Sequence, residues 1–389
     1  MKTSSETAVE ETKISLRKVF DKKTLFLLSF ALIMLLIYLY LEDVSLTKII
    51  ENFSQINPII LFLGAASTFI AVLFDTLAWK ILLGISSIRP SVPSIYRIQL
   101  ASFSYGLLIP SAGAIETIMR IALGTQEFVN EKEHRNATSG ELLSSVVAHR
   151  LCGLLVFIPI STFVAYALLR YFSDIYKEIT GQPLTNDMAI SFTLIISSLA
   201  ILVIIFFILI AKTPTTVKKI VLLIFKGLYP FPLIGNAAKN AVEPSKKIVD
   251  DFSIQFKFLA QNKSLTLVTL VLSFFSQITH WIAIFLILHS IGIPILLDQV
   301  VAVNFLGGTI DAIPIGIPGM AGLKEISLTV FLENIPGWVL PPTEKLEKAA
   351  TGAILVQLVK FYFLIIVGIL VYIAGKTRVT SQDLKEGNL

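Results

Sequence analysis

Charged side chains recur in a pattern within an otherwise apolar chain. Glu116 and Arg120 are four residues apart, so on a helix they would share one face and could form an ion pair. Lys324 and Glu325 stand in a similar setting further along the chain. Ionisable groups inside apolar segments are costly to bury and usually mark a binding site or a transport pathway. These four residues are therefore the first candidates for chemistry.

Each acidic residue follows a short turn that is rich in proline and glycine. The first turn contains Pro110 and Gly113, and the second contains Pro318, Gly319 and Gly322. Proline ends the incoming helix, and glycine permits a tight bend before the next one begins. We therefore expect an elbow at each place, with the glutamate in the first turn of the helix that follows.

Further cations could complete a site for a phosphate-bearing headgroup. Arg150 and Lys360 lie in the apolar segments after the two elbows, and Asp311 comes just before the second elbow. We expect these two cations, together with Arg120 and Lys324, to bind phosphate oxygens beside the free N–H groups of the half-helices. The glutamates would either carry protons that drive exchange or pair with a cationic headgroup. The alternative is that all these charges only neutralise one another.

The composition is that of a polytopic membrane protein, with 54% hydrophobic and 15% charged residues. A single cysteine excludes a disulfide framework, and the four histidines lack the spacing of metal ligands. We therefore expect no metal, no cofactor and no nucleic-acid partner. A lone histidine such as His149 is expected to make one packing hydrogen bond. The net charge of +5 fits lysines that face an anionic cytoplasmic leaflet.

Six apolar segments are long enough to cross a hydrocarbon core of about 30 Å. They are Thr24–Leu41, Asn57–Gly84, Glu141–Leu169, Met188–Ala211, Ser264–Ile291 and Ala349–Ala374. The two elbows interrupt two further segments, about Ser94–Leu123 and Asp298–Leu332. If both broken segments turn back, most lysines and arginines outside the spans share one side, as the positive-inside rule requires. We therefore expect both termini in the cytoplasm of a cell with this protein in its plasma membrane.

The chain also contains an internal repeat. Trp79 and Trp281 are 202 residues apart, and so are Gly106 and Gly308. With both elbows turning back, the two copies run in opposite directions, an arrangement that suits alternating access in transporters. The predicted fold is an all-α membrane protein with about six transmembrane helices and two re-entrant broken-helix hairpins in an inverted-topology repeat.

The predicted boundaries follow from the repeat. They are a cytoplasmic N-terminal segment 1–23, a membrane domain 24–374 with repeats at about 57–170 and 264–374, and a cytoplasmic tail 375–389. A lysine-rich segment, 212–263, joins the repeats. Its mixture of lysines and apolar residues predicts an amphipathic helix on the cytoplasmic leaflet, although a docking surface for a soluble partner is the alternative.

At the elbows the chain resembles the lysylphosphatidylglycerol-synthase transmembrane-domain family, also called flippase-like membrane proteins. The matching features are Gly113-x-x-Glu116, Arg150 in the following span, and Pro318-Gly319-x-x-Gly322-x-x-Glu325. The resemblance extends from about residue 20 to residue 375 and implies a module that flips a lipid between leaflets. Larger family members add a cytoplasmic aminoacyl-transferase domain. The sequence ends at Leu389, soon after the last span, so we expect no such domain here.

The sequence therefore predicts a lipid transporter, a flippase or scramblase, and not an enzyme. Its partner would be a lipid with an anionic, aminoacylated or polyprenyl-phosphate headgroup. Transport of a small soluble solute and a non-transporting scaffold that partners a lipid-modifying enzyme remain alternatives. The headgroup, the energy source, the direction of movement and a homo-oligomeric state stay open.

Overall fold

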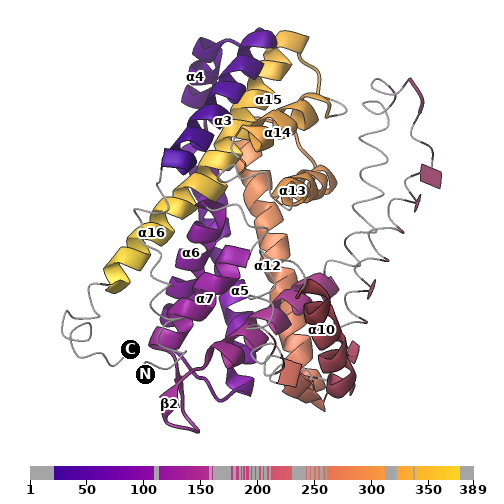
Figure 1. Ribbon diagram of the computed structural model, residues 1–389. Coiled ribbons are helices and arrows are strands. Elements are labelled where there is room, and N and C mark those ends of the chain that lie inside the picture. The colour runs from indigo at the N-terminus through magenta and orange to yellow at the C-terminus, as the bar shows by residue number, and fades with distance from the viewer. Residues whose placement is uncertain are drawn as a thin grey trace.

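In the computed structural model of the protein, the described residues are 22–108, 114–156, 214–229, 261–311, 322–335 and 338–376, with Met320 and scattered positions within 160–259. The fold of these residues is almost entirely helical (Figure 1). The only strands among them are β1 (Val129–Asn130) and β2 (Arg135–Asn136), which form a short antiparallel hairpin.

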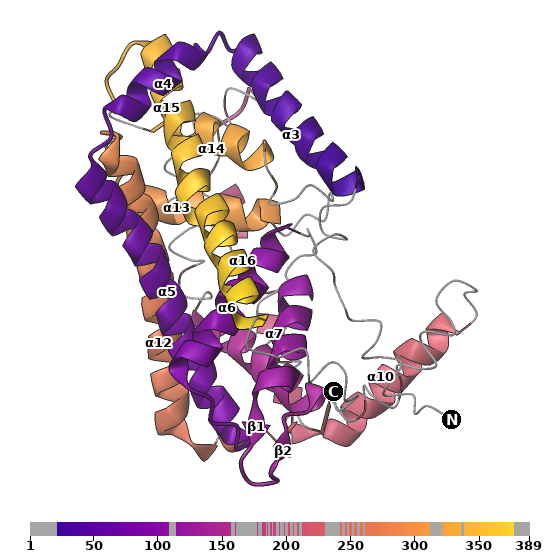
Figure 2. The ribbon, with the colours of Figure 1, turned by 90° about the vertical axis from the view of Figure 1, so that its left-hand side faces the viewer.

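Two long helices, α5 (Pro58–Ile85) and α12 (Lys263–Ser290), form the centre of the molecule and lie side by side (Figure 2). Each has 28 residues and is therefore about 42 Å long, enough to cross a hydrocarbon core. Asn57 caps α5 by accepting hydrogen bonds from the N–H groups of Ile59 and Ile60. A third stretch, Pro342–Ala374, is also long and apolar enough to span. The protein is thus membrane-embedded.

The two central helices run antiparallel. Near the start of α5, a Cβ added to Gly64 would lie 2.8 Å from a side-chain carbon of Ile287. Near the middle, the rings of Phe74 and Phe275 stack with centroids 5.7 Å apart. Position 64 of α5 thus meets position 287 of α12, and position 74 meets position 275, so the two helices run in opposite directions. Glycine at position 64 permits the close approach of the two backbones.

The first broken segment is a hairpin of two helices, α6 (Val92–Leu108) and α7 (Ala114–Glu127). At its open end, Ser94 donates a hydrogen bond to Glu127 at 2.9 Å. At the elbow end, a Cβ added to Gly106 would lie 2.8 Å from the Cβ of Glu116. These contacts place α7 antiparallel to α6. The two helices therefore form an antiparallel pair, whereas a re-entrant course within a membrane stays a prediction.

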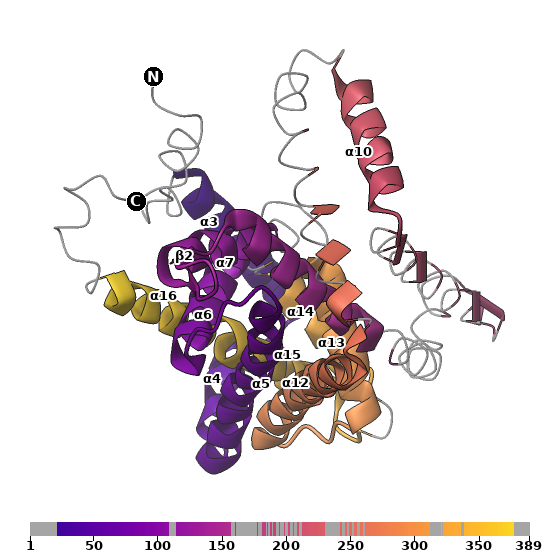
Figure 3. The same cartoon turned by 90° about the horizontal axis from the view of Figure 1, so that it is seen from below.

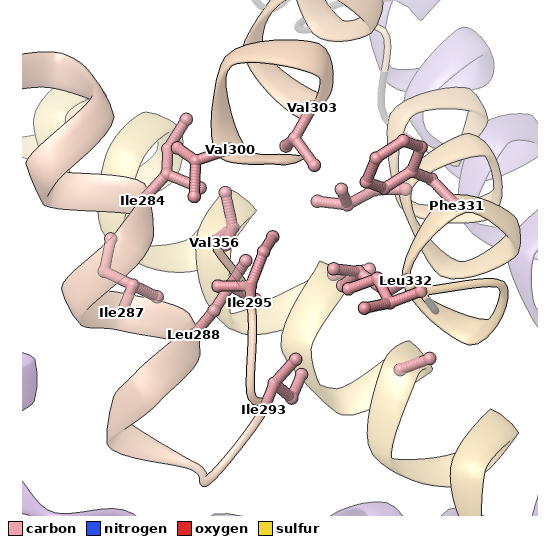
Figure 4. Packing of buried hydrophobic residues seen from close by; sticks show 14 of the residues in the cluster. Ile284, Ile287, Leu288, Ile293, Ile295, Val300, Val303, Phe331, Leu332 and Val356 are labelled. Atoms are coloured by element: carbon pink, nitrogen blue, oxygen red, sulfur yellow. The ribbon is translucent and has the colours of Figure 1, made fainter. Parts of the chain in front are cut away.

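The second broken segment also consists of two helices, α13 (Leu297–Asp311) and α14 (Leu323–Glu333). They are followed by α15 (Pro342–Gln357), η2 (Leu358–Tyr362) and α16 (Phe363–Lys376). Val303 of α13 and Phe331 of α14 belong to one buried apolar cluster with Ile284 of α12 and Val356 of α15 (Figure 4). This cluster fixes the second hairpin against α12 and is the largest apolar core among the described residues.

The last helix returns to the first hairpin, because α16 packs closely on α6 (Figure 1). A Cβ added to Gly368 would collide with the Leu100 carbonyl oxygen, so only glycine fits at this position. Beside it, the Ser104 hydroxyl donates to the Leu364 carbonyl at 3.2 Å. A glycine on one helix and a serine on the other thus join two segments from opposite ends of the chain.

A π-helical turn, η2, interrupts the predicted span Ala349–Ala374 and contains Lys360. Such turns insert one extra residue into a helix and are frequent at functional sites. The sequence pattern did not predict this turn, nor the short helix α4 (Leu46–Ser54) that follows α3 (Lys22–Leu41).

A polar network joins the end of α5 to the helix over 139–156. Asn130 donates to the Ser86 carbonyl at 3.1 Å and to Glu141 at 2.9 Å. Glu141 also accepts from both Arg135 and the Thr138 backbone N–H. Glu141 thereby connects both strands of the hairpin to the start of this helix.

In the 212–263 segment, α10 (Pro214–Leu228) is helical as expected and is set apart from the α5–α12 pair (Figure 3). Ile220 and Leu223 are exposed, while Lys218 pairs with Asp250 at 2.5 Å. The pattern of apolar and lysine residues on a helix is therefore present, whereas its contact with a membrane stays a prediction.

Several predictions concern residues outside the described part of the chain. These are most of the N-terminal segment, the tail beyond residue 376, and the elbow residues Pro110, Gly113, Pro318 and Gly319. The predicted spans Glu141–Leu169 and Met188–Ala211 are described only in part. The number of crossings, the domain boundaries and the inverted repeat accordingly stay predictions.

Candidate functional site

Three elements bring five ionisable side chains together inside the helical body. Asp75 comes from α5, Glu116 and Arg120 from α7, and His149 and Arg150 from the helix over 139–156. Glu116 is 8% exposed and Arg120 only 3%. Charges buried to this degree require partners, and each has at least one here.

Glu116 connects two guanidinium groups. Its Oε1 accepts from Arg120 Nη2 and its Oε2 accepts from Arg150 Nη2, both at 2.5 Å. The predicted pairing within α7 is therefore confirmed, and Arg150 joins it from the next helix. Such charge-assisted contacts are stronger than neutral hydrogen bonds and fix both guanidinium planes.

Asp75 holds the other side of Arg120 through His149. The Oδ1 atom of Asp75 lies 3.1 Å from His149 Nε2, and His149 Nδ1 lies 3.3 Å from Arg120 Nη1. Because arginine can only donate, Nδ1 must accept, so the ring proton is on Nε2 and points to Asp75. The expectation of a single packing hydrogen bond for His149 was wrong, since both ring nitrogens are used.

Arg120 is also fixed by an aromatic ring. Its guanidinium carbon lies 5.3 Å from the centroid of the Trp79 ring, within the range of a cation–π contact. Trp79 is itself fully buried and donates from Nε1 to Ser145 at 3.0 Å. One of the two repeated tryptophans thus supports the charged site and is no interfacial anchor.

A cavity of about 290 Å³ opens beside these charges. It is lined by Asp75, Arg120, His149, Arg150, Gly153, Leu154, Ser273 and Gln277. The Ser273 hydroxyl and Arg120 Nε have no hydrogen-bond partner among the described residues, although Ser273 is only 4% exposed. Both residues line the cavity, although these two atoms have almost no accessible surface. The Arg150 side chain, 49% exposed, supplies the accessible charge.

The cavity lies near the middle of the central helix pair. Asp75 is ten residues from the end of α5, which corresponds to about 15 Å of helix. Its neighbour Phe74 stacks on Phe275, close to the midpoints of both long helices. We therefore expect a ligand bound here to lie within the hydrocarbon layer that these two helices are long enough to cross.

The second elbow has different chemistry. Glu325 accepts from the Gly322 backbone N–H at 2.7 Å and from the Tyr362 hydroxyl at 3.2 Å, so it caps its own helix. Gly322 has a φ of +80°, which a residue with a side chain would adopt only under strain. The equivalent glutamates thus have unlike partners: two arginines in the first hairpin, a backbone amide and a tyrosine in the second.

Two cations accompany the second elbow. The Lys324 ammonium lies 3.8 Å from the centroid of the Phe361 ring, and Lys360 donates to Asn304 at 3.0 Å. Of the predicted site residues, Glu116, Arg120 and Arg150 are brought together, and Lys324, Glu325 and Lys360 lie around α14 and η2. The described residues of this second group do not line the cavity. The Asp311 side chain is outside the described part of the structure.

Sequence reasoning did not assign Asp75, Ser273 or Gln277 to the site. A signal existed for Asp75, which is the only acidic residue in the apolar α5. Ser273 and Gln277 are four residues apart and thus share a face of α12, but neutral polar residues are common in such helices. Only the packing of α12 against α5 brings them to the cavity.

Comparison with known families identifies the protein. A family model described as the lysylphosphatidylglycerol synthase TM region matches residues 26–368. The chain belongs to this family. The match to the lysylphosphatidylglycerol synthase TM region includes both hairpins and every residue that lines the cavity. It confirms the resemblance noted in the sequence and connects the protein to a membrane domain with lipid-related functions. No curated protein and no solved structure matches the chain.

Proposed function

We propose that this protein is a lipid transporter of the plasma membrane, a flippase or scramblase, and not an enzyme. It would move a phospholipid or a polyprenyl-phosphate-linked lipid between leaflets, with the headgroup passing through the cavity between α5, α7, α12 and the helix over 139–156. One observation carries the proposal: the cavity presents the half-exposed Arg150 beside the middle parts of the two long apolar helices α5 and α12.

The energetics support a phosphate-bearing ligand. A phosphate in the hydrocarbon layer loses its hydration, so it needs charged and polar donors along its path. Arg150 has N–H groups beyond the one that binds Glu116, and its side chain is half exposed beside the cavity. These donors are prearranged, because Arg120 fixes Glu116 and Glu116 holds the Arg150 guanidinium before a ligand arrives.

The arrangement of the central helices supports an inverted repeat with the cavity at its centre. Asp75 and Gln277 are 202 residues apart, the same offset as Trp79 and Trp281. Both residues of the first pair line the cavity, where antiparallel α5 and α12 cross. Binding at the interface of inverted repeats, near the midplane, is the arrangement found in alternating-access transporters.

The geometry disfavours an enzyme at this site. His149, the ionisable group best suited to act as a base, uses both ring nitrogens in contacts with Asp75 and Arg120. Transport of a small soluble phosphate ester is the second candidate, since a cavity of about 290 Å³ could hold such a solute entirely.

The test is transbilayer movement in proteoliposomes that contain the purified protein and a panel of labelled lipids, polyprenyl phosphate included. Wild type should move at least one lipid, and Arg150→Gln should slow that movement at least about tenfold. Arg89→Gln is the matched control, because Arg89 is exposed and its ion pair with Glu131 is loose, at 3.8 Å. If wild type moves no lipid but accumulates a soluble phosphate ester, the second candidate replaces the first.

A further inference from the structure

The charges around the cavity balance before any ligand binds. Asp75 and Glu116 are acidic, and Arg120 and Arg150 are basic. The two contacts of His149 fit the neutral ring, with Nδ1 accepting from Arg120 and Nε2 donating to Asp75, so we count no charge for it. The directly paired set is therefore neutral.

This balance constrains the ligand. A headgroup that brings only a phosphate would leave the site with a net negative charge in a medium of low dielectric constant, which is costly. A headgroup that brings a phosphate together with a cation leaves the site neutral. If the proposed transport function is correct, the neutral cavity should prefer a zwitterion over an anion.

The cavity offers a place for each charge. The half-exposed Arg150 guanidinium provides donors for a phosphate. On the acceptor side, the Asp75 side chain is 31% exposed, and the 3.7 Å separation of its Oδ2 from Arg120 is too long for a hydrogen bond. A carboxylate has about four acceptor positions, so Asp75 can accept further bonds beside those from His149 and Gln99.

The lining also distinguishes between two kinds of cation. A quaternary ammonium is usually held by the faces of aromatic rings, and the described lining residues include no tryptophan, tyrosine or phenylalanine. A primary ammonium has three N–H donors, which suit the Asp75 carboxylate and the amide oxygen of Gln277.

We infer that the cavity selects a zwitterionic headgroup in which a phosphate diester carries a primary ammonium, as in an ethanolamine phospholipid, with Asp75 as the specificity-determining residue. The phosphate binds at Arg150, and the ammonium binds at Asp75 and Gln277. This inference rests on the proposed transport function for its biological meaning, but the binding preference can be measured independently.

The first test compares three labelled phospholipids in proteoliposomes of one bulk composition: ethanolamine, choline and glycerol headgroups. Wild type should move the ethanolamine lipid at least about tenfold faster than the other two, the effect expected for one charge-assisted hydrogen bond. Asp75→Asn should remove this preference and favour the glycerol lipid, because the site then carries a net positive charge. Glu51→Gln is the matched control, since Glu51 is an exposed acid paired with Lys48.

Equal movement of the ethanolamine and glycerol lipids by wild type would overturn the inference while leaving the transport function standing. The inference also fails if Asp75→Asn slows all three lipids equally, because that result indicates a structural role. If wild type moves no lipid, the transport function fails, and binding decides the inference. In that case the zwitterionic diester glycerophosphoethanolamine should raise the thermal unfolding midpoint of wild type more than that of Asp75→Asn, and the anionic diester glycerophosphoglycerol should raise the midpoint of Asp75→Asn but not that of wild type. Equal stabilisation by both compounds would overturn it.

Discussion

Arg150 donates to Glu116 at 2.5 Å while about half of its side chain remains exposed. The glutamate thus fixes one edge of the guanidinium and leaves the rest available. This relationship gives the elbow carboxylate a positioning role, which differs from the proton-carrier role that the sequence left open.

Glu116→Gln should therefore be a severe substitution. It would leave two buried or half-buried guanidinium groups with Asp75 as their only remaining acid in the set. Breaking a buried ion pair costs about 3–5 kcal/mol, so the thermal unfolding midpoint in detergent should fall markedly. Glu127→Gln, at the open end of the same hairpin, provides the comparison. An unchanged midpoint for Glu116→Gln would show that the pair contributes little.

Glu325→Gln should be milder than Glu116→Gln. A glutamine oxygen can still accept from the Gly322 amide or from the Tyr362 hydroxyl, and no arginine loses a partner. We expect a loss of about 1 kcal/mol, typical of a weakened helix cap, and transport close to that of wild type. Tyr362→Phe should have a comparable effect. Equal and complete loss of transport in both glutamate variants would instead favour paired proton carriers.

Gly106→Ala should disrupt the first hairpin. The added methyl group would lie 2.8 Å from the Glu116 Cβ. This atom is bonded directly to the α7 backbone and cannot move freely, so α6 and α7 must separate. We expect a loss of about 1–3 kcal/mol, measured by thermal unfolding. Gly84→Ala is the matched control, because nothing lies within 4 Å of its added Cβ. A stable Gly106→Ala protein would contradict the close packing of the hairpin.

Substitutions at Gly153 should separate stability from transport. Gly153 lines the cavity, and nothing lies within 4 Å of an added Cβ. Gly153→Ala should keep or raise stability by about 0.5–1 kcal/mol, because alanine favours the helix. Gly153→Leu should retain the fold but fill the cavity and abolish headgroup movement. Normal transport by the leucine variant would place the pathway elsewhere.

Local rules predicted where the helices after the two elbows begin. Proline and glycine mark the elbows, and the structure begins α7 at Ala114 and α14 at Leu323, with Glu116 and Glu325 in the first turns as expected. The long spans followed from apolar length alone, which explains the close agreement for α5 and α12.

The site was predicted only in part, because its remaining members come from tertiary packing. Arg150 was identified by its position after the elbow, whereas Ser273 and Gln277 have no charge to mark them. The different roles of Glu116 and Glu325 could not be read from spacing, since both follow the same Gly-x-x-Glu pattern. Which partner reaches each glutamate depends on the helices packed around it.

The contact of α16 with α6 means that neither half of the chain is a self-sufficient unit. The Gly368 backbone fills a gap beside Leu100, and Leu364 accepts a hydrogen bond from Ser104 on the other half. A fragment that ended within the joining segment 212–263 would contain α6 without α16, so the surface of α6 around Leu100 and Ser104 would lose the helix that covers it. When the two halves are expressed as separate chains, they should therefore be purified together, and neither should be stable alone. An ancestral protein that consisted of a single repeat would have had to work as a dimer of two interlocked copies.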